Sequence, residues 1–325
     1  MRTRDGGPGH GTGQPAEGRA DGAPRYLGID IGGTKVALRT ESATGPAEET
    51  AFAWGPRRGA DHDLARLAEC VGTLTTRTGE PFRAVGVAVP ATVGPDERVT
   101  AWPSRSEWTG LPLGPALRAL FPGAAVAWAD DGDLAALAEA GAADCADLLY
   151  LGVGTGIGGG LVLGGRLCPG PDRGSFELGH LVVELDGPTC VCGRRGCLQA
   201  TASGPATLGR AALLRGAPVT FDELRAGLRD GRTWAVTALD RTGYALAAAI
   251  TGVTELLHPR LAVLGGGFAA GVPGLVDRVA GHLAGFARPG VPPLPVAPAR
   301  LGGLSSLRGA VLLARRQEGR PDGVR

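Results

Sequence analysis

The 325-residue sequence contains almost no lysine, no long apolar run and almost no net charge. Lys35 is the only lysine among 33 basic residues, which suggests a GC-rich genome that favours arginine codons. No apolar run reaches the roughly 18 residues that a transmembrane helix needs. A formal net charge of +1 gives no general reason to expect nucleic acid or an anionic membrane as a partner.

The first residues lack any apolar segment. Residues 1–24 are rich in glycine, proline, arginine and acidic residues, which excludes a secretory signal and predicts a disordered tail. We therefore expect a cytoplasmic location, where structural disulfides are rare. With 43% hydrophobic and 20% charged residues, the chain is typical of a globular protein, and its length favours two domains or one large α/β unit.

Apolar runs bounded by turn residues alternate with helix-like stretches, which indicates an α/β fold with mixed sheets. The segments YLGIDIGGTKVAL and LLYLGVGTGIGGGLVL each contain a strand, a glycine-rich turn and a second strand. Either segment alone is compatible with an ordinary β-hairpin, but together they predict two similar domains with the turns at a cleft. Strands are expected at 26–31, 36–40, 84–90, 125–130, 148–154, 158–165 and 260–266. Helices are expected at 61–78, 132–142, 234–257, 273–286 and 305–317.

Three glycine clusters follow predicted strands. In DIGGTK (30–35), two glycines permit a tight turn whose backbone N–H groups can hold phosphate oxygens, and the aspartate can orient Mg²⁺ through water. GVGTGIGGG (152–160) repeats this arrangement, and LGGG (264–267) can let a flat nucleoside lie against the backbone. The spacing is not that of a Walker A loop. Three such turns at strand ends nevertheless predict a nucleoside triphosphate held across a cleft.

Carboxylates cluster where a predicted strand passes into a helix. In WADDGDLAALAEA, Asp130 and Asp131 end the strand, and Asp133 lies near the start of the helix. Helix capping and the helix dipole are enough to explain Asp133. They explain the two strand-end carboxylates less well, because α/β folds place ligands at this edge. One of the two can take the proton from a substrate hydroxyl group as it attacks a γ-phosphate.

Three of the six cysteines fall within CVCGRRGC. With an upstream histidine they give H-x9-C-x-C-x4-C, formed by His180, Cys190, Cys192 and Cys197. Three thiolates and one imidazole suit a closed, tetrahedral, structural Zn²⁺ site. A disulfide framework fits a short secreted chain, which this is not. Three unconnected thiols are the remaining alternative.

Together these motifs resemble those of the ROK family (repressors, open reading frames, kinases) of the hexokinase/actin-like ATPase superfamily. LGIDIGGTK is similar to the family's first phosphate motif, GTGIGGG to its second, LGGG to its adenosine motif, and E-x-G-H with CVCGRRGCL to its zinc signature. The resemblance implies a two-domain, actin-like ATPase (ribonuclease H-like) α/β fold with mixed sheets and a cleft that closes over Mg-ATP and a sugar. Residues 25–130 then form a smaller domain, completed by helix 305–317, and residues 131–304 form a larger one that contains the zinc loop 180–197.

The resemblance also assigns roles to individual residues. Asp131 matches the catalytic base, and Asp130, Glu177, His180 and Gln199 are expected to position the sugar, His180 being a zinc ligand as well. The expected cofactors are ATP, Mg²⁺ and structural Zn²⁺, and a homodimer is compatible with the family. The expected nucleotide contacts are Asp30, Gly32, Gly33, Thr34, Lys35, Gly154, Thr155, Gly156, Gly158, Gly265, Gly266 and Gly267.

Five positions depart from the family pattern, all at or near the expected sugar pocket. Asp130 replaces Asn, Gln199 replaces Glu, Phe176 and Ala91 each replace Gly, and AWPSRSEW (101–108) replaces a loop with Asn-Leu before Trp. These changes alter the hydrogen-bond polarity of the pocket. We expect an ATP-dependent kinase whose acceptor is a hydroxyl group, a primary one, of a modified hexose or C7-cyclitol. An ordinary glucokinase is the main alternative; a sugar-responsive regulator and an inactive sugar-binding protein explain fewer of the motifs.

Overall fold

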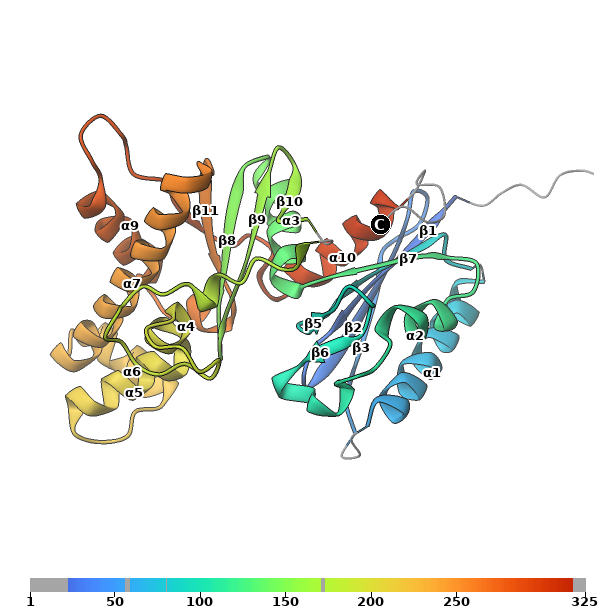
Figure 1. The fold of residues 1–325 in the computed structure, drawn as a ribbon, viewed down its shortest axis with the longest axis horizontal. Helices are drawn as coiled ribbons and strands as arrows, with labels where there is room; N and C mark the ends of the chain where they lie inside the picture. The colour runs from blue at the N-terminus through green and yellow to red at the C-terminus, as the bar shows by residue number, and fades with distance from the viewer. Residues whose placement is uncertain (1–22, 56–58, 80, 171–172, 318–325) are drawn as a thin grey trace, which may run out of the picture.

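The computed structural model describes residues 23–55, 59–79, 81–170 and 173–317. In these residues the longer strands form two five-stranded mixed sheets, one in each half of the molecule (Figure 1). This is the α/β class that the sequence predicts. The predicted disordered tail lies outside the described residues, apart from its last two positions. Among the described helices, none has the length and apolar character needed to span a bilayer.

The first sheet is parallel on one side of its central strand and antiparallel on the other. Its strands are β1 (Arg25–Ile31), β2 (Lys35–Ser42), β3 (Glu48–Ala53), β4 (Ala84–Ala88) and β7 (Ala125–Ala129), in the order β3-β2-β1-β4-β7. β1 pairs in parallel with β4, and β4 with β7, whereas β2 is antiparallel to both β1 and β3. All five residues of β4 are buried, as expected for a strand covered on both faces.

The second sheet repeats this arrangement. Its strands are β8 (Leu148–Val153), β9 (Ile157–Leu163), β10 (Arg166–Cys168), β11 (Leu261–Gly265) and β12 (Val296–Pro298), in the order β10-β9-β8-β11-β12. Again the first three strands are antiparallel neighbours, and the last two add in parallel. The predicted internal repeat is therefore a repeat of sheet topology. A short hairpin of β5 (Thr92–Val93) and β6 (Val99–Ala101) lies outside both sheets.

Helices cover the sheets and form two large apolar cores. One core joins the first sheet to α1 and α2, and the other joins the second sheet to helices that include α7 and α9. The α-helices are α1 (Ala60–Thr78), α2 (Leu113–Leu120), α3 (Asp131–Ala143), α4 (Leu198–Ala202), α5 (Gly204–Arg215), α6 (Phe221–Arg229), α7 (Thr233–Leu257), α8 (Gly267–Gly271), α9 (Leu275–Phe286) and α10 (Ser305–Arg316). The 3₁₀ helices are η1 (Pro103–Trp108), η3 (Leu178–His180) and η4 (Gly302–Leu304).

The last helix, α10, returns to the first sheet and packs against β1, β4 and α3 (Figure 1). Glycines make this close approach possible. Gly28 and Gly86 are paired across β1 and β4, and a Cβ atom at Gly86 would lie 2.0 Å from the carbonyl oxygen of Ala310. On its other side, a Cβ atom at Gly309 would lie 1.9 Å from the carbonyl oxygen of Leu134 in α3. The helix is therefore in backbone contact with elements that precede it by more than half of the chain.

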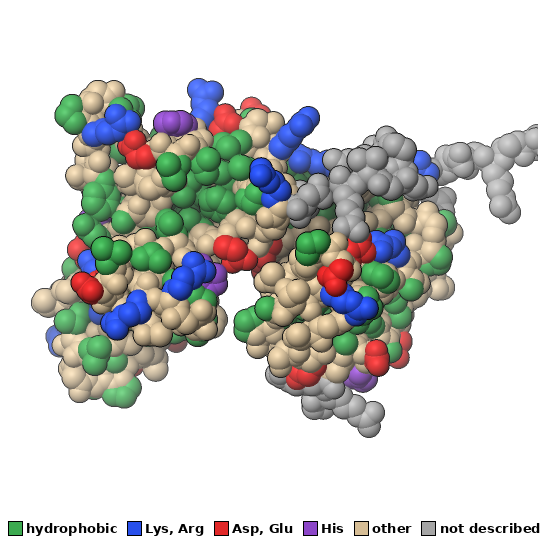
Figure 2. All heavy atoms as spheres, viewed as in Figure 1, with side chains coloured by type: hydrophobic (Ala, Val, Ile, Leu, Met, Phe, Trp, Pro, Cys, Tyr) green, Lys and Arg blue, Asp and Glu red, His purple; other side chains and the backbone are tan. Residues whose placement is uncertain are grey.

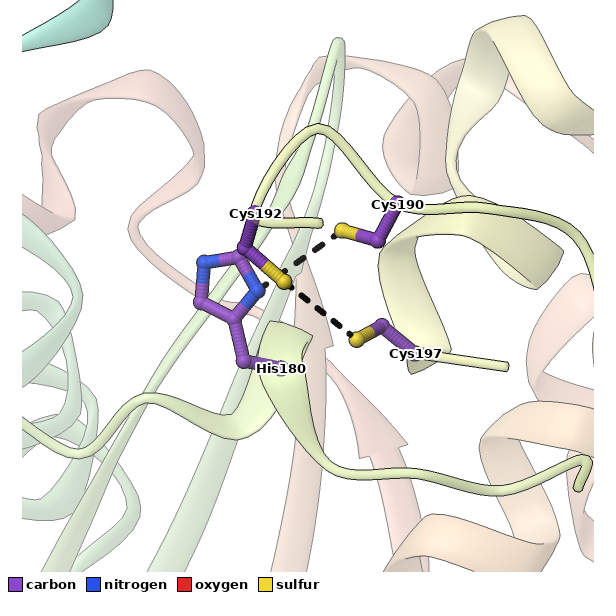
Figure 3. A group of neighbouring side chains, drawn as sticks. All are labelled: His180, Cys190, Cys192 and Cys197. Atoms are coloured by element: carbon purple, nitrogen blue, oxygen red, sulfur yellow. Dashed lines mark hydrogen bonds between the residues drawn. The ribbon is translucent and has the colours of Figure 1, made fainter. Parts of the chain in front are cut away.

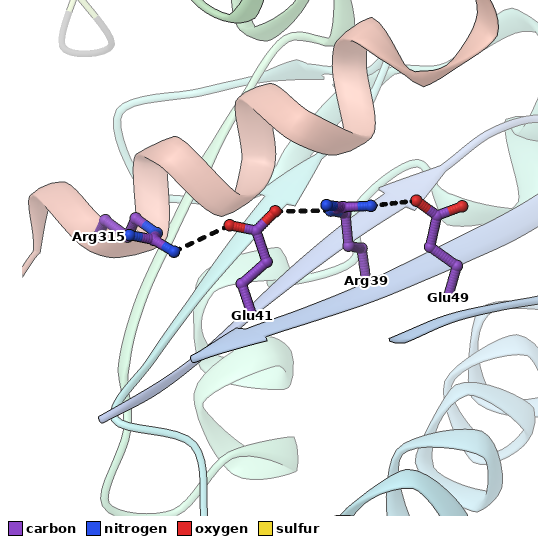
Figure 4. A network of polar contacts seen from close by, with 4 residues as sticks. All are labelled: Arg39, Glu41, Glu49 and Arg315. Carbon is purple, nitrogen blue, oxygen red and sulfur yellow. Dashed lines mark hydrogen bonds and ion pairs between the residues drawn. The ribbon is translucent and has the colours of Figure 1, made fainter. Parts of the chain in front are cut away.

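Charged side chains also attach α10 to the edge of the first sheet (Figure 4). Arg315 donates to Glu41 on β2 at 2.9 Å, and Glu41 accepts from Arg39 at 2.7 Å. Arg39 pairs with Glu49 on β3. These residues are partly exposed, so each pair contributes about 1 kcal/mol or less. The buried glycine contacts, not this network, hold the helix in place.

Candidate active site

The candidate site lies where strands of the two sheets end at a cleft. Figure 2 shows a hollow between the two halves, with acidic side chains gathered at its inner end. β1, β4 and β7 are parallel, so their carboxyl ends lie at one edge of the first sheet. This edge carries Asp30 at the end of β1 and Asp130 directly after β7. Ligand sites in α/β sheets are found at this edge.

The two adjacent aspartates at the start of α3 differ in role. Asp130 is the N-cap residue, and its Oδ1 accepts the N–H of Gly132 at 2.9 Å. Asp131 is the first residue of the helix and makes no such cap. Burial, followed by the charge of Asp30, raises the pKa of Asp131 to about 6. A carboxylate with a pKa near neutrality is suited to accept a proton during a reaction.

Asp133 also lies in this group of acids. The sequence pattern predicted it only as a residue at the start of the helix. Its side chain is only 4% exposed, and Oδ1 has no hydrogen-bond partner among the described residues. Burial raises the pKa of Asp133 to about 7, while the N–H of Phe176 lowers it and Glu177 and Asp131 raise it. Capping falls to Asp130, so of the two helix-start preferences only the helix dipole applies to the carboxyl group at position 133. No feature of the sequence alone distinguished these two acids.

The carboxyl groups at this edge repel one another. Burial raises the pKa of Asp130 well above its usual value, and the charges of Asp131, Asp133 and Glu177 add to this effect. Burial also raises the pKa of Asp30, against a hydrogen bond that Ser306 donates to its Oδ2 at 2.6 Å. Such a concentration of buried acids is stabilised by a cation. The site is therefore built to receive positive charge.

The first glycine turn connects β1 to β2. The N–H of Gly32 donates to the carbonyl oxygen of Lys35 at 2.9 Å, which closes the turn. Thr34 and Lys35 are exposed there. Loop 101–108, which the sequence assigned to the sugar pocket, packs behind this turn, since a Cβ atom at Gly33 would lie 2.7 Å from the Oγ of Ser104.

The second and third glycine turns belong to the other sheet. Gly154 donates to the carbonyl oxygen of Gly156 at 2.9 Å, between β8 and β9, with Thr155 exposed at the tip and Gly158 exposed on β9. Gly265 ends β11 and Gly267 begins α8. Gly266 between them needs to be glycine, because its φ is +85° and a Cβ atom would lie 2.5 Å from the carbonyl oxygen of Val153. Its backbone therefore brings the third turn against β8, next to the second.

His180, Cys190, Cys192 and Cys197 converge as predicted (Figure 3). One ligand atom from each lies within 4.8 Å of the others. The ring contributes Nδ1, which is 3.8 Å from the Sγ of Cys190, and its second nitrogen points away from the thiols. The backbone N–H of Arg194 lowers the pKa of the Cys192 thiol to about 6, which favours the thiolate that binds metal. Three sulfur atoms and one nitrogen at this spacing fit Zn²⁺.

Gln199 lies beside this cluster. Its Nε2 donates to the Sγ of Cys190 at 3.3 Å, and its Oε1 lies on the side of Gly156 and Gly179. A glutamate at this position could not donate to a thiolate. Glu177 is exposed and accepts from the Oγ of Ser175 at 2.6 Å. The sugar contacts expected of Asp130, Glu177, His180 and Gln199 remain predictions.

Comparison with known proteins supports the family resemblance of the glycine and cysteine motifs. The ROK family profile matches residues 26–317. Kanosamine kinase from Amycolatopsis mediterranei (strain S699) is 64% identical over 293 residues, which is 90% of this chain and 97% of that protein. The ROK hexokinase of Thermus thermophilus superposes with a TM-score of 0.79 at 30% identity, covering 90% of this chain and 98% of the other. A ROK family glucokinase from Streptomyces griseus, solved with glucose and AMPPNP, gives 0.73 at 26%, covering 90% and 99%.

The fold and these relatives define an ATP-dependent sugar kinase of the actin-like ATPase fold. The chain belongs to the ROK family. The family resemblance read from the glycine and cysteine motifs is therefore confirmed, as is the expectation of a kinase for a modified sugar.

Proposed function

We propose that this kinase transfers the γ-phosphoryl group of Mg-ATP to a primary hydroxyl group of kanosamine. Kanosamine is the hexose in which an amino group replaces the hydroxyl group on C3, and it is a cation at neutral pH. The observation that carries the proposal is the carboxylate at position 130, beside the acids 131, 133 and 177. The 64% identity to a kanosamine kinase supports the same acceptor.

The electrostatics of the pocket favour a cationic acceptor. Only Oδ1 of Asp130 is used in capping α3, which leaves Oδ2 for a ligand. An ammonium group there would offset the repulsion among the neighbouring carboxylates and keep Asp130 ionised. A neutral hydroxyl group at the same place leaves that repulsion in force. An asparagine, usual in the family, carries no charge and has no such preference.

The remaining residues have roles that follow from their positions. We infer that Asp131 takes the proton from the attacking hydroxyl group, and that Glu177 and His180 orient the ring. The 32–35 and 154–158 turns would hold the phosphates, and Asp30 would help to hold Mg²⁺, which would supply charge stabilisation to the transferring group. The adenosine lies at 265–267. We infer that residues 25–130, completed by α10, and residues 131–304 form two domains, and that closure of the cleft between them excludes water.

The test compares acceptors in two proteins. We expect kcat/KM to be higher for kanosamine than for glucose in the wild type, and Asp130→Asn to reduce this preference about tenfold or more, as for a lost hydrogen bond between charged groups. Asp222→Asn is the matched control, because this side chain of α6 is exposed. N-acetylmannosamine and C7-cyclitols complete the screen. Glucose as the best substrate of the wild type would show an ordinary glucokinase.

This comparison also tests whether amino-acid composition alone explains the aspartate at position 130. The chain contains no asparagine at all, so an aspartate at position 130 is also what a codon bias against asparagine would leave. If the bias were the whole cause, Asp130→Asn would raise kcat/KM for glucose and for kanosamine alike. A change in the ratio of the two constants is expected only if the carboxylate contacts the amino group.

We also propose that the cysteine cluster holds one structural Zn²⁺ per chain, with all four positions filled by protein. Because the metal would close the 180–197 loop, its removal should loosen the side of the cleft that presents Glu177 and His180. Cys192→Ser is expected to release zinc to a chelator that leaves the wild type loaded, and to lower the melting temperature. Cys70→Ser, outside the cluster, is the control. Metal analysis that finds no zinc in a fully active preparation would contradict the site.

A further inference from the structure

A buried ion pair lies behind the first glycine turn. Arg105 of η1 is 3% exposed and Asp63 of α1 is 1% exposed, and the two pair directly. The same Oδ2 of Asp63 accepts from the Nε1 of Trp108 at 2.8 Å. Burying two charges is costly unless hydrogen bonds satisfy them. Nothing in the proposed reaction uses this pair, so its presence calls for a separate explanation.

The buried network reaches the backbone of the turn at two points. The Nε of Arg105 donates to the carbonyl oxygen of Gly33 at 3.2 Å. The Nε1 of Trp54, which follows β3, donates to the carbonyl oxygen of Gly32 at 2.8 Å. The guanidinium group of Arg105 lies over the Trp54 ring, 4.3 Å from its centre. This cation–π contact holds the two donors against each other. Two consecutive carbonyl groups of the turn are thus held by side chains.

This arrangement fixes the direction of two N–H groups. In a trans peptide the C=O and N–H bonds point in opposite directions. When the carbonyl groups of Gly32 and Gly33 point into the buried network, the N–H groups of Gly33 and Thr34 point away from it. Neither N–H donates to another described residue, whereas the N–H of Gly32 is used in closing the turn. Adjacent outward N–H groups of this kind form an anion-binding concavity.

We propose that Arg105 is a positioning residue that holds the 32–34 turn in its phosphate-binding conformation. Its positive charge at the Gly33 carbonyl oxygen also polarises that peptide group and strengthens its N–H as a donor. Because Arg105 belongs to loop 101–108, it connects this loop to the nucleotide side of the cleft. The inference rests on the proposed function only in taking the 32–34 turn as a phosphate site. It does not depend on which sugar is phosphorylated.

The test is the binding of Mg-AMPPNP to Arg105→Lys. A lysine keeps a cation for Asp63 but lacks the guanidinium fork that serves Asp63 and Gly33 together. We expect the dissociation constant of Mg-AMPPNP and the KM for ATP to rise about tenfold, as for one lost charge-assisted hydrogen bond, with a smaller change in the KM for the sugar. Trp54→Phe keeps the ring and removes the donor to Gly32, and is expected to act in the same direction.

Arg98→Lys is the matched control, because the Nη1 of the exposed Arg98 also donates to a glycine carbonyl oxygen, that of Gly110, at 2.7 Å. It should leave nucleotide binding unchanged. A folded Arg105→Lys protein with wild-type affinity for Mg-AMPPNP overturns the proposal, whether or not its melting temperature falls. If Arg105→Lys does not fold, Trp54→Phe provides the test. An unchanged affinity of that variant for Mg-AMPPNP then overturns the proposal. A wild-type protein that binds no Mg-AMPPNP would instead refute the phosphate site itself.

Discussion

Asp131→Asn is expected to lower kcat about a thousandfold, within the range that loss of a general base produces. Asparagine has the same shape but cannot accept the proton of the attacking hydroxyl group. The dissociation constant of Mg-AMPPNP should change little, since the phosphate turns do not include position 131. Rapid-quench measurement of sugar phosphate formation, with Asp222→Asn as a control, checks this. Turnover near the wild-type rate would show that another group is the base.

The same assignment predicts a pH dependence. The pKa of Asp131 is raised to about 6, and the base works only when ionised, so activity is retained above this pH and lost below it. In the free enzyme, kcat/KM for the sugar should fall about tenfold for each pH unit below the pKa. Because several carboxyl groups interact here, the measured value belongs to the group of acids. A profile that stays flat through this region would contradict the assignment.

Gly309→Ala should lower the free energy of unfolding by about 3 kcal/mol, as overpacking in a tight contact does. A Cβ atom there would lie 1.9 Å from the carbonyl oxygen of Leu134, and backbone cannot move aside as a flexible side chain can. The sign is informative, because alanine is otherwise preferred to glycine within a helix. Urea unfolding followed by circular dichroism measures the effect.

The matched control is Gly252→Ala in α7, where nothing lies within 4 Å of the added carbon. That change should stabilise the protein by about 0.5–1 kcal/mol through helix propensity alone. Because the displaced helix α3 begins at Asp131, Gly309→Ala protein that remains folded should also lose activity. Equal stability of the two variants would mean that α3 and α10 do not cross this closely.

The sequence predicted the elements whose pattern is locally determined. Apolar runs marked the six inner strands of the two sheets and the edge strand β7, and the helix-like stretches marked α1, α3, α7, α9 and α10. The edge strands β3, β10 and β12 were missed. β3 alternates exposed and half-buried residues, and the other two are only three residues long. Edge strands are short or polar because one side faces solvent, so they carry little sequence signal.

Within the site, motifs with fixed spacing were predictable and long-range pairs were not. The zinc ligands span 18 residues with a recognisable spacing, and the structure brings them together. Arg105 and Asp63 are 42 residues apart, and an arginine in a polar loop is ordinarily exposed. Gln199 was expected at the sugar. Its hydrogen bond to Cys190 could be predicted only from the orientation of the side chain. Such contacts depend on tertiary packing, which single-sequence patterns do not encode.

The return of α10 to β1 and β4 has a consequence for synthesis on the ribosome. The strands that surround Gly28 and Gly86 are translated early, but the helix that covers them is made of residues 305–316. Until these residues have been made, this face of the first sheet has no covering helix among the described residues and exposes apolar surface. The first sheet is thus begun before the second sheet and is covered only after it. Chaperone dependence during translation should accordingly be concentrated in the N-terminal sheet.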